Sequence, residues 1–267
     1  MKKYFKTLFL GLSFLFLLAG CASNQPALNQ PTLDQIKSRG TILVGATGDY
    51  KPLSVREQNG TLWGFDIDIA KAIAERLGVE PEFVATSWPS LSDDTMAERF
   101  DIATTGITIN ETRKKTMLMS DGYLASGKTI LCRKGDAAKF TSLESIDKKG
   151  VRVMINPGGT NEKFARANFK NAKIIVHKKN AEIPAQIAKG AADVMITETT
   201  EAPYYVANNP KLAAPLLESP FTRDEIGALM SQNKGDLQSF VNKVIAEMKA
   251  NGELKKITEK YGLVYSY

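Results

Sequence analysis

The sequence predicts an α/β fold of two lobes, joined by two strands and enclosing a ligand cleft. Apolar strand-like runs alternate with segments of helical period, and no long series of hairpins interrupts them. The alternation starts afresh after residues 128–135, and a final apolar run precedes a helical C-terminal segment. Alternation of this kind is typical of layers built on largely parallel sheets, and a cleft between two lobes is the usual place for a small ligand.

The first half of the predicted body alternates strand and helix. TILVGAT (41–47) is a short apolar run, and GFDIDIAKAIAERLG (64–78) places apolar residues at helical spacing before Gly78, a residue type that commonly ends helices. The remaining elements expected here are a strand in EPEFVAT (80–86), a helix from Trp88-Pro89 to Phe100 and a strand in DIATTGITI (101–109).

A second unit follows, large enough to hold a hydrophobic core of its own. Its expected elements are strands in VRVMINPGG (151–159), KIIVH (173–177) and ADVMIT (192–197), and helices in TNEKFARANF (160–169), EIPAQIAKG (182–190) and the segment that begins near Glu198. We expect crossings between the lobes at 128–133 and 226–230. Lobe 1 would then span residues 33–128 and 230–267, and lobe 2 residues 129–229.

The N-terminus has the pattern of a secretory signal. Residues 1–20 combine a basic start, an apolar core too short for a comfortable membrane span and a small-residue end. LAGC (Leu18–Cys21) looks like a bacterial lipobox, which predicts a lipid anchor on Cys21; a plain signal peptide with a chance cysteine is the alternative. Residues 22–32 are polar and Pro-bearing, as expected of a tether. The protein is therefore expected outside the cytoplasm, lipid-anchored to a bacterial membrane.

Composition narrows the possible partners and chemistry. Residues 1–20 hold three lysines and no acids, so their removal takes the formal net charge from +6 to +3. No basic block with interleaved aromatics occurs, which argues against nucleic acid and leaves a small-molecule ligand. Cys132 is the only other cysteine and His177 the only histidine, so no internal disulfide, zinc site or Ser/His nucleophile is expected. Phosphate-loop and dinucleotide motifs are missing too, and no cofactor or metal is predicted.

Two strand-to-helix junctions offer groups for an anion. INPGGTNEKF (155–164) ends a strand and starts a helix, so Asn156, Gly159 and Thr160 could surround an anion at the positive helix end; an ordinary turn is equally compatible. TTGITINETR (104–113) supplies Gly106, Thr108 and Arg113. The planar guanidinium of Arg113 suits a carboxylate, although a lone arginine is more often a solvated surface charge.

Aromatic and acidic side chains complete the set of candidate site residues. Tyr50, beside Asp49, and Trp88 could wall a ring-shaped ligand; core packing of Trp88 and a partly exposed loop position for Tyr50 are the alternatives. Glu198 and Glu201 are three positions apart. If a helix begins near Glu198, their side chains share one face and point into one space. An exposed acidic first turn, favoured by the helix dipole, is the competing interpretation.

FDIDIAKAIAERLG, FDIATTGITINETR and GGTNEKF resemble the extracytoplasmic solute-binding proteins of polar amino-acid transporters, over nearly the whole chain after the tether. The resemblance implies the type II periplasmic-binding-protein fold, with two hinge strands and lobes that close over a ligand. It also implies that Arg113 takes an α-carboxylate with help from Thr108 and Thr160, and that Glu198 takes the α-ammonium.

TGDYKP (47–52), TSWPSL (86–91), SGKT (126–129), KIIVH and the long run NPGGTNEKFARAN (156–168) resemble a narrower group, the cyclohexadienyl dehydratases. These enzymes share the binding-protein fold and convert prephenate to phenylpyruvate and arogenate to phenylalanine. The resemblance implies that Glu201 is the general acid and Lys128 a pocket lysine. Glu198 replaces an aspartate of that family and APYY after Glu201 also departs from it, which bears on substrate preference.

The chemistry of that reaction agrees with these residues. Loss of CO₂ and water makes the substrate ring aromatic, and the poor hydroxyl leaving group needs one positioned acid. A glutamate can serve only if burial and a neighbouring charge raise its pKa, which Glu198 and lobe closure could do for Glu201. The first hypothesis is therefore a dehydratase without cofactor. The second is a transport-linked amino-acid or carboxylate binder with a permease partner, and a structural or adhesive role is a distant third.

Overall fold

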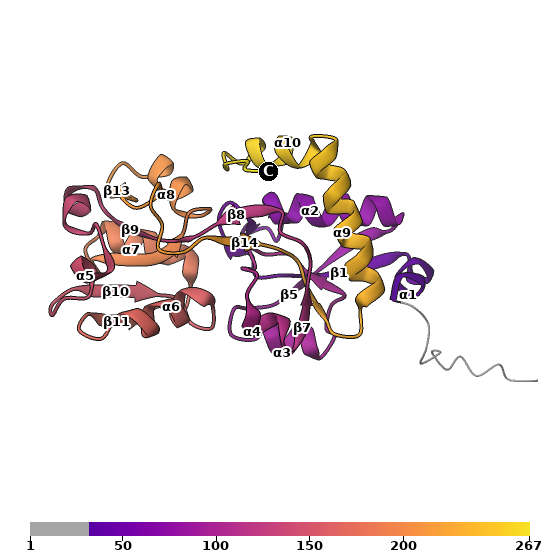
Figure 1. The fold of residues 1–267 in the computed structure, drawn as a ribbon, viewed down its shortest axis with the longest axis horizontal. Helices are drawn as coiled ribbons and strands as arrows, with labels where there is room; N and C mark the ends of the chain where they lie inside the picture. Colours follow the sequence, from indigo (N-terminus) through magenta and orange to yellow (C-terminus); the bar gives the residue numbers. More distant parts are fainter. Residues whose placement is uncertain (1–31) are drawn as a thin grey trace, which may run out of the picture. The chain divides into compact units, whose positions relative to one another are not determined.

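The computed structural model describes residues 32–267 (Figure 1). The predicted signal sequence, the lipobox cysteine Cys21 and residues 22–31 of the predicted tether lie outside these residues. Thr32, the last residue assigned to the tether, already begins helix α1 (Thr32–Arg39). Within the described range, none of the helices is long and apolar enough to cross a membrane.

Lobe 1 is built on a five-stranded sheet with the strand order β5-β1-β6-β15-β7. Its strands are β1 (Thr41–Ala46), β5 (Glu80–Ala85), β6 (Ile102–Ala103), β7 (Met117–Met119) and β15 (Leu229–Ser231). Strand β1 runs parallel to β5 and β6, whereas β15 runs antiparallel to β6 and β7. The chain thus returns from lobe 2 to place β15 inside the first sheet.

Helices and a small sheet complete lobe 1. These elements are α2 (Phe65–Leu77), α3 (Leu91–Met96), α4 (Glu111–Lys114), α9 (Gly235–Ala250), α10 (Glu253–Lys260) and the three-stranded sheet of β2 (Asp49–Tyr50), β3 (Ser54–Arg56) and β4 (Leu62–Trp63). Helix α2 packs on β1 and on α9, and the apolar residues Ile69, Ile73 and Ile245 of these helices, all at most 2% exposed, belong to one core. Burial of each such side chain contributes about 1.5–3 kcal/mol.

Lobe 2 carries a second five-stranded sheet, with the order β11-β10-β12-β9-β13. Its strands are β9 (Lys128–Arg133), β10 (Arg152–Ile155), β11 (Lys173–Val176), β12 (Val194–Glu198) and β13 (Leu212–Ala213), with helices α5 (Leu143–Ile146), α6 (Thr160–Asn168), α7 (Ile183–Ala188) and α8 (Ala202–Asn208) and 3₁₀ turns η1 (Lys134–Lys139) and η2 (Asn180–Glu182). Every residue of β12 is buried, as a central strand covered on both faces requires. The free thiol of Cys132, on β9, is fully buried as well.

The strand pair between the two sheets differs from the expected crossings. It consists of β8 (Leu124–Ser126) and β14 (Asp224–Ile226), which run antiparallel (Figure 1). The segment 128–133, expected to cross, is instead β9, because its continuous apolar run suits a strand between two others in a covered sheet. The segment 226–230 falls at the end of β14 and the start of β15.

Gly127 lies where β8 passes into β9, against the returning chain. A Cβ atom here would overlap the carbonyl oxygen of Thr222 and approach Pro220 at 3.1 Å. The same two segments are joined by hydrogen bonds from the Lys128 N–H to the Thr222 hydroxyl (2.8 Å) and from the Phe221 N–H to the Lys128 carbonyl (2.7 Å). The hinge therefore depends on a residue without a side chain at this position.

Gly127→Ala should lower the free energy of unfolding by about 1–3 kcal/mol, because the added methyl group must push two hydrogen-bonded backbones apart. Urea unfolding of the residue 32–267 domain measures this difference. Gly135→Ala is the matched control, since nothing lies within 4 Å of its added Cβ. Equal stability of the two variants would contradict the close approach at the hinge.

Candidate active site

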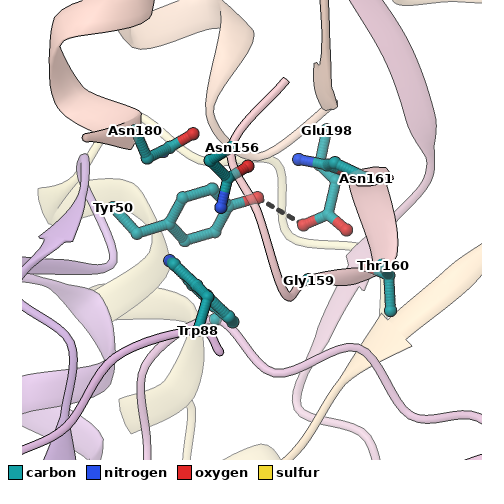
Figure 2. A pocket seen from close by; sticks show the side chains of 9 residues that line it. Tyr50, Trp88, Asn156, Gly159, Thr160, Asn161, Asn180 and Glu198 are labelled. Atoms are coloured by element: carbon teal, nitrogen blue, oxygen red, sulfur yellow. Dashed lines mark hydrogen bonds between the residues drawn. The ribbon is translucent and has the colours of Figure 1, made fainter. Parts of the chain in front are cut away.

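A small cavity lies between the lobes, and we call it the interlobe cavity. Its volume is about 20 Å³, room for about one water molecule. Figure 2 shows the side chains around it, which come from both lobes. It is lined by Tyr50, Trp88, Gly106, Asn156, Gly159, Thr160, Asn161, Asn180 and Glu198. Seven of these were candidates from the sequence, whereas Asn161 and Asn180 were not.

The Glu198 carboxylate joins the two lobes through its hydrogen bonds. The antiparallel register of β9 and β12 places it opposite Lys128, whose ammonium forms an ion pair with its carboxylate. From lobe 1, the Tyr50 hydroxyl donates a hydrogen bond to Oε2 (Figure 2) and the Thr108 hydroxyl donates one to Oε1 at 2.9 Å. The carboxylate is only 3% exposed, so all its partners are protein groups.

Glu198 remains ionised in this environment. Burial alone would raise its pKa, but the Lys128 ammonium and the hydrogen bonds from Lys128, Tyr50 and Thr108 together lower the pKa below its ordinary value. Lys128 also donates to the Thr160 hydroxyl at 2.7 Å. The lysine therefore links the end of β12 to the start of α6.

Glu201 has the opposite electrostatic character. Its side chain is completely buried, with Oε1 accepting from the Asn180 amide at 2.7 Å and Oε2 accepting from the Thr197 hydroxyl. Burial raises the pKa of Glu201 to about 8, with smaller increases from Glu198 and Asp49, although both hydrogen bonds oppose the shift. At neutral pH this carboxyl is therefore mostly protonated.

The predicted helical face does not account for the placement of the two glutamates. Glu198 is the last residue of β12, and Glu201 is the N-cap of α8 after a turn closed by the bond from the Glu201 N–H to the Glu198 carbonyl (3.0 Å). No helix contains both residues. Glu198 borders the interlobe cavity, whereas Glu201 lies behind Asn180 and does not.

Arg113 and Thr108 lie next to the interlobe cavity without lining it. Arg113, on α4, donates through Nη1 to the Thr108 carbonyl at 2.5 Å. Burial lowers the pKa of Arg113 to about 10, against a smaller opposing effect of Glu198, so the side chain remains a cation at neutral pH. It borders an adjoining cavity of about 90 Å³ that shares Trp88, Gly159 and Thr160 with the interlobe cavity.

The aromatic wall belongs to lobe 1. Tyr50 is 3% exposed and meets Trp88 edge to face, with ring centroids 5.6 Å apart. The Trp88 indole N–H donates to Asp49 at 2.9 Å, and burial is the main cause that raises the Asp49 pKa. Gly106 has φ +79° and presses against the Tyr50 ring, where a Cβ would overlap it. Its N–H donates to Asp66, a fully buried carboxyl on α2.

Three amide oxygens at the interlobe cavity are unpaired among the described residues. They are the Oδ1 atoms of Asn156, Asn161 and Asn180, each on a side chain at most 7% exposed. Buried acceptors without a partner are costly, so these oxygens suit a ligand that brings hydroxyl or ammonium donors. Local sequence gave no signal for Asn180, which stands among charged surface residues. Asn161 lies within the 155–164 junction but was not among its candidate residues.

The fold and the interlobe cavity define a two-lobed solute-binding architecture. Residues 42–264 match the bacterial extracellular solute-binding proteins, family 3, and the chain belongs to that family. Membership places it outside the cytoplasm, in a family that binds small molecules.

Two curated relatives represent the two functions found among similar chains. The chain is 41% identical to the cyclohexadienyl dehydratase of Pseudomonas aeruginosa, over 98% of this chain and 96% of that one. It is 29% identical to the L-cystine-binding protein TcyJ of Escherichia coli K12, over 94% and 93%.

Solved structures similar to this chain include proteins with the same two functions. An ancestral amino acid-binding protein, a precursor of cyclohexadienyl dehydratase, matches with a TM-score of 0.81 at 38% identity, over 86% of this chain and 99% of that chain. An ancestral cyclohexadienyl dehydratase matches with a TM-score of 0.55 at 50% identity, over 88% and 97%.

Lys128→Met should lower the free energy of unfolding by about 3–5 kcal/mol, because it leaves the buried Glu198 carboxylate without its cation. Lys128→Met combined with Glu198→Gln should recover part of that loss, since a neutral amide needs no counter-charge. Urea unfolding of the parent, the single variants and the double variant measures the coupling energy. Purely additive losses would argue against a strong buried ion pair.

Proposed function

We propose that the protein is a cyclohexadienyl dehydratase, which converts prephenate to phenylpyruvate and L-arogenate to L-phenylalanine. The observation that carries this proposal is the fully buried Glu201, whose raised pKa of about 8 keeps a proton available next to the interlobe cavity at neutral pH. The 41% identity to a cyclohexadienyl dehydratase over almost the full chain supports it.

The reaction needs an acid and no base. Both substrates are cyclohexadienes with a ring carboxylate and, across the ring, a hydroxyl. The electron pair of the bond to the carboxylate moves into the ring as CO₂ leaves. The C–O bond breaks at the other end, and water departs with the proton that Glu201 supplies. General acid catalysis of such a step is typically worth about 10²- to 10⁴-fold in rate.

The neighbouring groups have complementary roles in this proposal. Trp88 and Tyr50 would wall the ring, and the start of α6 at Thr160 with the Arg113 cation would hold the side-chain carboxylate. Lys128 is fixed between Glu198 and Thr160, so it would orient the part of the substrate that lies near Thr160. The departing ring carboxylate loses its negative charge as CO₂ forms. Strong contacts to this carboxylate would therefore stabilise the substrate more than the transition state and would slow the reaction.

Substrate entry requires the lobes to part. Ligand pockets of this kind usually enclose about 300–1,000 Å³, far more than the interlobe cavity. Separation would break the bonds of Tyr50 and Thr108 to Glu198 and bend the β8–β14 hinge. The low TM-score of 0.55 at 50% identity supports such movement, because rearranged lobes reduce structural overlap without reducing sequence identity.

The alternative is an amino-acid or carboxylate binder that delivers its ligand to a transporter permease. The relationship to an L-cystine-binding protein is consistent with it. The arrangement of Glu198 argues against it, because the Lys128 ammonium already occupies the carboxylate on which a ligand ammonium would bind. A bound amino acid would have to displace a buried ion pair.

We also propose that the protein is tethered by a lipid on Cys21, from the LAGC run. Radiolabelled fatty acid should enter the full chain in bacterial cells, and Cys21→Ser should abolish the labelling. Retained labelling in the serine variant would place the lipid elsewhere, and an unlabelled parent would favour a plain signal peptide.

The mature domain should release phenylpyruvate from prephenate, and Glu201→Gln should reduce kcat by about 10²- to 10⁴-fold. Activity should fall as the pH rises through about 8, because Glu201 then loses its proton. Phenylpyruvate absorbance in alkali follows the reaction, with a protein-free sample to correct for spontaneous acid decay of prephenate.

Glu144→Gln is the matched control, because Glu144 is an exposed acid of lobe 2. It should keep parental activity. A folded parent without turnover above the spontaneous rate, together with amino-acid binding by calorimetry, would replace the dehydratase by the binder.

A further inference from the structure

Asn180 stands between the interlobe cavity and Glu201. It belongs to η2, is 1% exposed and lines the cavity, whereas the carboxyl behind it is completely buried and does not. Figure 2 shows its side chain beside the Tyr50 ring, across from Glu198. A ligand in the cavity would therefore meet Asn180 before Glu201.

The Asn180 amide nitrogen joins the two lobes. Nδ2 donates to Glu201 Oε1 at 2.7 Å within lobe 2, and to the Asp49 carbonyl at 3.3 Å in lobe 1. An amide nitrogen has two hydrogens, so each serves one lobe. Because the amide group is planar, these two bonds fix its orientation.

The third corner of the same amide is Oδ1, which is buried and has no partner in the described part of the chain. With Nδ2 occupied by Glu201 and Asp49, Oδ1 is the atom left to receive a donor from the cavity. The ring hydroxyl of a cyclohexadiene substrate is such a donor.

We infer that Asn180 is a positioning residue for the dehydratase proposed above, holding the Glu201 carboxyl in its reactive orientation only while the lobes are closed. The catalytic part of this inference rests on the proposed function. The structural part does not depend on the reaction. It states that Asn180 donates a hydrogen bond to Glu201 and that the contact with Asp49 orients the amide for this bond.

The amide determines which carboxyl oxygen carries the proton. Nδ2 can only donate, so Oε1 is an acceptor in either protonation state. The proton of neutral Glu201 then resides on Oε2 and is donated to the Thr197 hydroxyl oxygen, whereas ionised Oε2 accepts from that hydroxyl. When the lobes part, the Asp49 contact is lost and the amide is free to rotate. A rotated amide would present Oδ1 to Glu201 as an acceptor and move the proton from Oε2 to Oε1.

Four other titratable groups face Glu201 and bear on its titration. They are Glu198 at the end of β12, Asp49 and Tyr50 on β2, and Tyr205 on α8. All four are retained when Asn180 is replaced. A change in the Glu201 pKa on replacement of Asn180 therefore does not come from the loss of a neighbouring charge.

The test is Asn180→Leu, which keeps the branched shape of the side chain and removes the donor, beside Asn168→Leu as a control at an exposed asparagine of α6. We expect kcat for prephenate to fall about 10- to 100-fold with little change in KM, as a misplaced catalytic group would cause. The basic limb of the pH profile should move to higher pH, because a hydrogen bond to ionised Glu201 is lost. A lower Tm with an unmoved basic limb would make Asn180 merely structural.

A second measurement needs no turnover. Carboxyl ¹³C NMR of glutamate-labelled protein, with Glu201→Gln to assign the signal, should give a higher Glu201 pKa in Asn180→Leu than in the parent. Identical pKa values would overturn the inference even in an active enzyme. An inactive parent with the expected NMR shift would instead reject the proposed function and retain the bond. Asn180→Ala replaces the leucine variant if that variant does not fold.

Discussion

The ion pair between Lys128 and Glu198 is the interaction on which the arrangement of the site depends. The pairing of β9 with β12 sets the two residues opposite each other, and the lysine makes a buried carboxylate tolerable. Because Glu198 stays charged, it can accept hydrogen bonds from Tyr50 and Thr108 of the other lobe and add to the field that keeps Glu201 neutral. Two glutamates three positions apart thus hold opposite protonation states, because only one has a cation beside it.

Much of the fold could be predicted because its longer elements carry clear periodicity. The helix expected over 64–78 is α2, and Gly78 adopts the left-handed conformation that ends it. Strands expected at 41–47, 173–177 and 192–197 are β1, β11 and β12. The hinge pair β8–β14 and the small β2–β3–β4 sheet could not be predicted from the sequence. Strands of two or three residues are too short to show an alternating pattern, and they form only because the tertiary fold places a partner strand beside them.

The site residues, like the elements of the fold, could be predicted only in part. Residues at strand ends and helix starts, such as Gly106, Glu198 and Thr160, could be singled out because backbone geometry concentrates polar groups at those junctions, and all three border the interlobe cavity. Arg113 was also singled out, but a bond to the Thr108 carbonyl holds it at the adjoining cavity. Asn180 could not be found, since its place depends on η2 packing against β2, more than a hundred residues away in sequence.

The buried thiol of Cys132 makes this molecule convenient for spectroscopic labelling. Its burial raises the pKa to about 11, so the thiolate that reacts with maleimide or methanethiosulfonate reagents is scarce at neutral pH, and the sulfur is sealed within β9. Residues 32–267 contain no other cysteine. A pair of surface cysteines introduced one per lobe would therefore carry fluorophores or spin labels without background, and would report the separation of the lobes in solution directly as a distance.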